Sequence, residues 1–305
     1  SNILEKIYKE KGKVDLIANQ FSYANWAGNP NDDVFRDDQI EKRIDRLELL
    51  YKKLKPSKIL LFASFIYFCH EENFYNNYSR KFSYYVSEIE SRGIELVLPV
   101  PDQILKMSEL NNCDYSNNNL RAIRFWDNLK DKVKPIIFSK KDISLDEVRD
   151  SYYSFFEEMW SFNSLKNNRN SRNKNYNLKI LIKDLNKIVE IYLFKKKINI
   201  SDNHSEIKNY DIILSIESFI FILKNQFGRG TILVNSRVEF IYERIHKFFF
   251  FFYVYYSNNI GNFFNDKKVT EDNLKKILNS STLKTFYKYN KSFKENFLND
   301  AKLFG

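Results

Sequence analysis

The sequence predicts a mixed fold, with an α/β first part, a helical segment and an α+β last part. In the first part, short apolar runs alternate with segments of helical periodicity, a pattern typical of strands joined by crossover helices. After an Asn-rich stretch near 166–177, apolar and polar residues alternate instead, which indicates strands with one buried face. We therefore expect three regions, at 1–110, 111–175 and 176–305.

Three apolar runs in the first part predict strands, at 14–18, 58–64 and 94–98. The middle run, KILLFAS, shows no polar alternation, and this is typical of a strand buried on both faces of a parallel sheet. Between the runs, 35–55 and 79–92 carry apolar residues every three or four positions and predict helices. The first part therefore has the order of a parallel sheet with crossover helices.

The later part gives more varied signals. Ser144 is followed three residues on by Glu147, which is the capping box of a helix start. The stretch 178–200 alternates on both sides of DLNK and predicts a β-hairpin, and we expect a further strand-rich region at 210–240. The apolar run 248–256 is about half as long as a spanning helix requires. A buried core segment is favoured there over an edge that touches a membrane.

Charge and cysteine content set limits on location and partners. The net charge is +10, but the basic residues are spread along the chain, which favours a compositional bias over a nucleic-acid partner. No signal peptide or membrane span is evident. Cys69 and Cys113 form neither a metal motif nor a disulfide framework. We therefore expect a cytoplasmic protein.

Two segments carry a resemblance to a known family. VDLIANQFSYANWAGNP (14–30) and ILLFASFIYFCHEENFY (59–75) resemble motifs of the metallo-β-lactamase fold superfamily, in the branch of the UlaG-like proteins and the CMP-N-acetylneuraminate hydroxylases. FGRGTILVNSR (227–237) is similar to a segment of a sterol-carrier-like appendage in such proteins, with Gly230 and Ser236 departing from the pattern. The resemblance implies half of an αββα sandwich, followed by a sterol-carrier-like α+β part.

The family's principal metal motif, H-x-H-x-D-H, is absent from this chain. Its three histidines are His70, His204 and His246, and the last two have no spacing to other ligands. We therefore expect either the C-terminal portion of a longer protein, whose partner is the missing N-terminal half of the fold, or a natural protein that has lost the catalytic half. The intact site would hold zinc or iron, and we expect this chain alone to bind neither.

The resemblance assigns metal-site roles to four residues. His70 matches the last histidine ligand of the family's dinuclear site, and a neutral imidazole is a common ligand for zinc. Glu71 and Glu72 would orient the imidazole or a bound water. Asp15 matches a family residue outside the ligand set, with a structural or orienting role. The alternative for His70 is a structural, hydrogen-bonded histidine at the end of a strand.

The loop after the first strand supplies the candidate substrate pocket. Tyr23, Asn25 and Trp26 lie on it, and loops at strand ends commonly carry sites. Ordinary loop packing is the alternative for these residues. The resemblance implies a metal-dependent hydrolase or oxygenase acting on a small molecule, a sugar nucleotide or phosphorylated sugar. The competing hypothesis is a non-catalytic binding or scaffold module for an apolar ligand or a protein partner.

Overall fold

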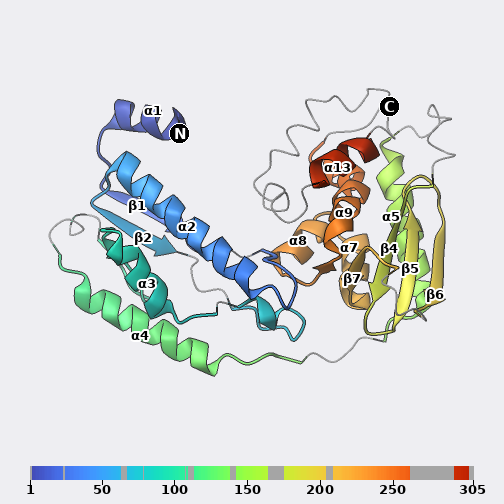
Figure 1. Ribbon diagram of the computed structural model, residues 1–305, viewed down its shortest axis with the longest axis horizontal. Coiled ribbons are helices and arrows are strands. Elements are labelled where there is room, and N and C mark those ends of the chain that lie inside the picture. The colour runs from blue at the N-terminus through green and yellow to red at the C-terminus, as the bar shows by residue number, and fades with distance from the viewer. Residues whose placement is uncertain are drawn as a thin grey trace. The chain divides into compact units, whose positions relative to one another are not determined.

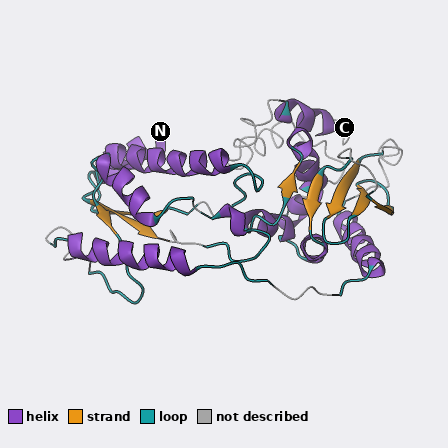
Figure 2. Ribbon diagram, turned by 60° about the horizontal axis from the view of Figure 1, so that its bottom comes forward, coloured by secondary structure: helices purple, strands orange, loops and turns teal. Residues whose placement is uncertain are grey.

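The structure is a computed structural model. It describes residues 2–22, 25–62, 67–77, 79–106, 108, 113–137, 142–163, 175–203, 209–261 and 292–301. The chain divides into two compact units, 1–138 and 139–305, and each combines a sheet with helices (Figure 2). The predicted mixed α/β character is therefore confirmed. The division falls inside the predicted helical segment 111–175, and the two helices of that segment belong to different units.

The first unit is built on a three-stranded parallel sheet. Its strands are β1 (Leu16–Gln20), β2 (Lys58–Phe62) and β3 (Leu96–Val97), in that order. Helix α2 (Asp33–Leu54) connects the first pair, and α3 (Phe82–Ser91) connects the second pair (Figure 1). The predicted alternation of strand and helix is confirmed, with boundaries shifted by a few residues.

Burial in β2 differs from the prediction. Ile59 and Leu61 are fully buried, whereas the side chain of Phe62 is 44% exposed. The strand therefore has one well-covered face instead of two. A continuous apolar run does not distinguish these cases, because burial depends on what packs on each face of the sheet.

Two further helices complete the first unit, α1 (Asn2–Lys11) and α4 (Ser116–Lys132). Helix α4 carries Asn119, whose buried amide donates to Leu96 O over 2.8 Å and accepts from Leu98 N over 2.9 Å. The side chain therefore pairs with the outer edge of β3 as a neighbouring strand would. This contact satisfies backbone groups that would otherwise be left at a buried sheet edge.

The second unit has a five-stranded mixed sheet. The order is β6-β5-β4-β7-β8, with β4 and β7 parallel and the other neighbours antiparallel. The strands are β4 (Asn177–Ile182), β5 (Lys187–Tyr192), β6 (Ile198–Asp202), β7 (Ile212–Leu214) and β8 (Glu239–Phe240). The predicted hairpin is confirmed, because β4 and β5 pair on either side of the DLNK turn.

Helices account for much of the remaining described chain in this unit (Figure 1). They are α5 (Leu145–Ser161), α7 (Ile216–Lys224), α8 (Gly228–Val234), α9 (Ile245–Phe251), α10 (Tyr253–Asn259), α13 (Phe293–Ala301) and the short 3₁₀ turn Tyr242–Arg244. The predicted cap of α5 is present, because Ser144 Oγ accepts the amide of Glu147 over 3.1 Å. Among the helices described, none has the length and apolar character that a membrane crossing requires.

The prediction of a strand-rich region at 210–240 is wrong. The structure has two short strands, β7 and β8, separated by the helices α7 and α8. Ser215 begins α7 by accepting the amide of Ser218 over 3.3 Å. By composition, the apolar run of α7 fits a strand or a buried helix equally well. The N-terminal cap at Ser215 favours the helix.

The apolar run 248–256 forms much of the core of the second unit, as predicted. Its residues belong to α9 and α10, and Phe248, Phe250 and Phe251 are fully buried. Phe293 and Phe297 of α13 add two more fully buried rings. The ring centroids of Phe250 and Phe297 lie 5.7 Å apart in an edge-to-face arrangement that aromatic pairs favour.

Candidate functional site

The two segments that resemble the metallo-β-lactamase motifs meet at one edge of the first sheet. Strands β1 and β2 are parallel and in register from Leu16 with Lys58 to Gln20 with Phe62. Beyond this ladder, Phe21 N donates to Phe62 O over 3.3 Å. Both segments therefore leave the sheet at its carboxyl edge. Binding sites of parallel sheets commonly form at this edge.

His70 begins a compact turn after β2. Its carbonyl accepts the amides of Asn73 and Phe74, and its backbone pairs with Ile136 in an isolated parallel bridge. The backbone amide of Glu72 donates to His70 Nδ1 over 3.1 Å. Because a neutral imidazole has one N–H and Nδ1 is the acceptor here, the ring carries its proton on Nε2.

The two glutamates beside His70 differ in exposure. Glu71 is exposed, and its amide donates to Ile136 O over 3.3 Å. Glu72 is half-buried and contacts the imidazole through its backbone amide. One contact that orients His70 is therefore made by the main chain of Glu72.

The predicted pocket loop contacts the His70 turn through one of its residues. Asn76 Nδ2 donates to Asn25 O over 3.0 Å. Trp26 is 4% exposed, and its ring centroid lies 5.6 Å from that of Phe35. Trp26 therefore packs in the core, which agrees with the alternative of ordinary loop packing. Tyr23 lies outside the described residues.

Arg36 connects the two segments and was not singled out from the sequence. Its side chain, in the first turns of α2, is 4% exposed and donates to Asn29 O over 2.8 Å and to Pro30 O over 2.9 Å. Its guanidinium also lies over the ring of Tyr75, 5.3 Å from the centroid. Arg36 thus fixes the loop after β1 against the turn that begins at His70.

Asp15 lies at the other end of the strands. It is exposed and precedes β1, and its carbonyl accepts the amides of Ser57 and Lys58. The sequence places Asp15 inside the strand, whereas β1 begins one residue later. The fold therefore does not gather Asp15 with His70 at the carboxyl edge, and its visible role is in the backbone pairing at the start of β2.

The described residues do not form a metal site on their own. No group of three or more His, Cys, Asp or Glu side chains among them is arranged to hold an ion. Zinc sites in proteins normally require three or four protein ligands, and His70 is a single candidate. His204, a further histidine of the chain, lies outside the described residues. The residues present therefore do not fit a resident metal without additional ligands.

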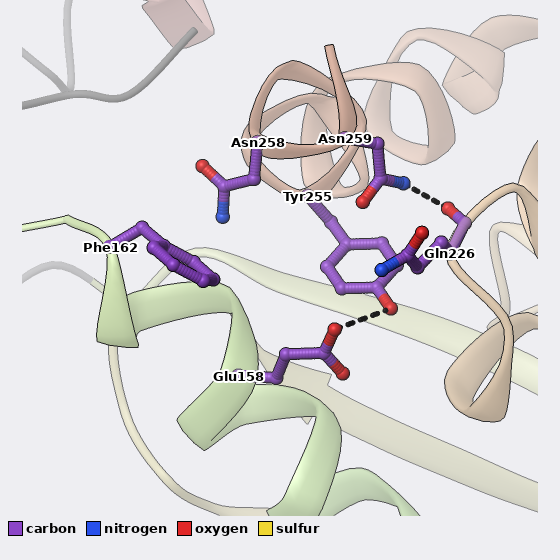
Figure 3. Close-up of a pocket in the computed structure, with 6 residues that line it drawn as sticks. All are labelled: Glu158, Phe162, Gln226, Tyr255, Asn258 and Asn259. Carbon is purple, nitrogen blue, oxygen red and sulfur yellow. Dashed lines mark hydrogen bonds between the residues drawn. The ribbon is translucent and has the colours of Figure 1, made fainter. Parts of the chain in front are cut away.

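The second unit contains a cavity of about 150 Å³, which we call the polar cavity (Figure 3). Its lining residues are Glu158, Phe162, Gln226, Tyr255, Asn258 and Asn259. Tyr255 is 5% exposed, and its hydroxyl donates to Glu158 Oε1 over 3.3 Å. Burial, together with the negative charge of Glu158, raises the pKa of Tyr255 to about 12. The hydroxyl therefore remains a donor at neutral pH.

The amides of Asn258 and Asn259 are held by both backbone and side-chain contacts. Asn258 Nδ2 donates to Met159 O over 2.8 Å, and Asn163 Nδ2 donates to Asn258 Oδ1 over 2.9 Å. Asn259 Nδ2 donates to the carbonyl of Gln226, so its Oδ1 points away from that contact, on the side of Tyr255 (Figure 3). The sequence contains no signal for this cavity, because its residues come from segments about 100 positions apart.

A second group of titratable residues lies where α13 packs against α9. Tyr176 Oη donates to Asp300 Oδ2 over 2.7 Å, and His246 Nε2 lies 3.6 Å from the same oxygen. Burial raises the pKa of Asp300 to about 6 and lowers that of His246 to about 4. Near neutral pH, His246 is therefore neutral, in keeping with a structural histidine.

No family model, curated protein or solved structure matches this chain. The likeness to the metallo-β-lactamase superfamily thus depends on the motifs at 14–30 and 59–75.

Proposed function

We propose that this chain is part of a metal-dependent hydrolase or oxygenase of the metallo-β-lactamase fold, to which it contributes His70. The remaining ligands are supplied by a segment outside the chain, because H-x-H-x-D-H is absent from the sequence. By the same resemblance, we propose a sugar nucleotide or a phosphorylated sugar as substrate and the cytoplasm as location. The free thiols of Cys69 and Cys113 are consistent with a reducing compartment.

One observation carries this proposal. The two segments with family motifs are far apart in sequence, yet both leave the sheet at the carboxyl edge of adjacent parallel strands. There the Asn76–Asn25 contact and Arg36 hold them together. Crossover connections bring the ends of consecutive parallel strands to this edge in any such sheet, so the contacts of Asn25, Asn76 and Arg36 support a binding site here, and the motifs themselves support the family.

Metal binding by His70 has a structural consequence. If a metal takes Nε2, the ring proton moves to Nδ1, which then no longer accepts the amide of Glu72. If a metal takes Nδ1, the same contact is replaced directly. In both cases metal binding releases the Glu72 amide, so the proton resonance of this amide reports on occupancy of the site.

The proposal is tested by metal analysis of two purified proteins, the chain 1–305 and the complete product of its gene. We expect zinc or iron near one or two ions per molecule in the complete product, as in mono- and dinuclear hydrolytic sites. We expect much less than one ion in the chain alone. A stoichiometric metal in the chain alone, or none in a complete product that carries H-x-H-x-D-H, would contradict the proposal.

We also propose that the second unit corresponds to the sterol-carrier-like appendage, since its mixed sheet and helices agree with an α+β part. The alternative function, an apolar-ligand module, has less support from the described residues. Phe248, Phe250, Phe251, Phe293 and Phe297 fill the described core of this unit. Its polar cavity is lined mainly by polar side chains.

A further inference from the structure

The polar cavity lies where the C-terminal ends of α5 and α10 meet the turn between α7 and α8. Glu158 and Phe162 come from the end of α5, Asn258 and Asn259 from the end of α10, and Gln226 from the short turn between α7 and α8 (Figure 3). The last turn of a helix carries a partial negative charge on its unpaired carbonyls. The ends of α5 and α10 therefore favour a cation in this cavity.

The side chains add to this preference. None of the six lining residues is basic. Within the described part of the chain, Glu158 accepts a hydrogen bond from Tyr255 and has no cationic partner. The polar cavity is therefore a locally acidic site on a chain whose net charge is +10, so general charge attraction of cations to this protein is not expected.

The cavity also has the groups that recognise an ammonium ion. The rings of Phe162, which is 53% exposed, and Tyr255 offer faces for cation–π contact. Glu158 and the Oδ1 of Asn259 are acceptors for N–H donors, and the amide of Asn259 is held by the carbonyl of Gln226. An alkylammonium group uses both kinds of contact, whereas an anion would meet acceptors and negative helix ends.

A larger cavity of about 570 Å³ lies along α5 and shares the lining residue Glu158 with the polar cavity, and we call it the acidic groove. Asp146, Glu147, Asp150 and Glu158 line it, together with Lys224, which pairs with Glu147 over 2.7 Å. Among the described residues, Asp150 has no cationic partner. Asp150 and Glu158 are separated by about 12 Å along the helix axis, at the rise of an α-helix.

We propose that the polar cavity and the acidic groove together bind a linear polyamine. Its terminal primary ammonium lies in the polar cavity at Glu158, and the following ammonium groups lie along α5 near Asp150. Two carboxylates about 12 Å apart cannot share one metal ion, but they match separate charges on an extended chain. The inference is independent of the proposed metal role, because all of these residues belong to the second unit.

The test is calorimetric titration of the chain with spermidine near neutral pH at physiological ionic strength. We expect saturable binding of one spermidine per chain and no binding of 1,8-octanediol, a neutral chain of similar length. Glu158→Gln is expected to weaken binding about tenfold, because a charge-assisted hydrogen bond is lost. Asp150→Asn is expected to weaken it less, since the far ammonium group at Asp150 lacks the two aromatic faces, Phe162 and Tyr255, of the polar cavity.

Glu157→Gln is the matched control, because it makes the same charge change one residue away. Glu157 pairs with Lys196 over 2.8 Å and lines neither cavity, so spermidine affinity should be unchanged. Equal weakening by the Glu157 and Glu158 variants would overturn the proposal, because a general field effect would then explain the binding. Failure of spermidine to bind, or binding of a tetralysine peptide in its place, would also overturn it. Circular dichroism of each variant verifies that the fold is intact.

Discussion

The amide of Glu72 donates a hydrogen bond of 3.1 Å to Nδ1 of His70. Through this contact the His70 side chain accepts a backbone hydrogen bond within the turn that it begins. Such a contact is the structural role that the sequence leaves as the alternative for a lone histidine after an apolar strand. The same residue is the ligand that the family resemblance implies. The two roles use the same imidazole in different protonation patterns, so they can be separated by substitution.

His70→Asn and His70→Ala separate them by stability. The Asn side chain can place an oxygen near the position of Nδ1 and accept the Glu72 amide, so we expect a free energy of unfolding close to wild type. Ala leaves the Glu72 amide without this acceptor, so the free energy of unfolding should fall by about 1 kcal/mol. Urea denaturation measures both. An Asn variant as unstable as the Ala variant would show that the Glu72 contact does not account for the structural role.

Arg36→Lys tests how the candidate site is held together. The guanidinium donates to both Asn29 O and Pro30 O, whereas an ammonium on a shorter, non-planar head cannot reproduce the fork. We expect a loss of about 1–2 kcal/mol in the free energy of unfolding. Arg46→Lys, at an exposed position of the same helix, should change it by less than about 0.5 kcal/mol. Equal effects of the two variants would contradict the role given to Arg36.

Gly228 and Gly230 form a matched pair in α8. A Cβ on Gly228 would lie 2.7 Å from both Phe221 O and Ile222 Cα, so Gly228→Ala should destabilise the chain by about 1–3 kcal/mol. A Cβ on Gly230 meets nothing within 4 Å, and Ala there should add up to about 1 kcal/mol of helix stability. Thermal unfolding distinguishes them. A neutral Gly228→Ala would show that α7 and α8 are not so closely packed.

Asp300→Asn should change the pH dependence of stability. The pKa of Asp300 is raised to about 6 by burial, above an unfolded value of about 4, so its contribution to stability is complete below pH 4 and is lost as pH rises through 6. Asn remains able to accept from Tyr176 without this loss. We therefore expect the free energy of unfolding of the variant, relative to wild type, to increase by about 1–2 kcal/mol between pH 4 and neutral pH.

The control for this prediction is Glu295→Gln, which makes the same charge change at an exposed position of α13. Its stability relative to wild type should show little pH dependence over the same range. If the difference in free energy of unfolding between Asp300→Asn and wild type stays constant from pH 4 to neutral pH, the pKa of Asp300 is not raised by folding.

Local signals in the sequence account well for some elements. The helical periodicity of 35–55 and the alternation around DLNK predict α2 and the β4–β5 hairpin, because each pattern fits one kind of secondary structure. The prediction for 210–240 is wrong because the apolar run in this region fits a strand or a buried helix equally well. Ser215, which caps the N-terminus of α7, is the local signal that distinguishes the helix from a strand. This signal is evident only when the residues before the apolar run are examined as possible helix N-caps.

The candidate sites depend on contacts that residue order does not contain. His70 and Asn25 are predicted as site residues, and the structure places their segments at one sheet edge. Arg36, which holds those segments, looks like one of many surface charges of a helix until its 4% exposure is known. Glu158 and Asn259 are likewise unremarkable in sequence, because their proximity arises only when α5 and α10 pack together.

The metal content of the His70→Asn variant tests the central claim most directly. The complete gene product would be purified as wild type, as His70→Asn and as Glu10→Gln, whose exposed side chain on α1 serves as the control. We predict that zinc or iron falls by at least one ion per molecule in the His70 variant and is unchanged in the Glu10 variant, with both folded. Full metal content in a folded His70→Asn protein would contradict the account.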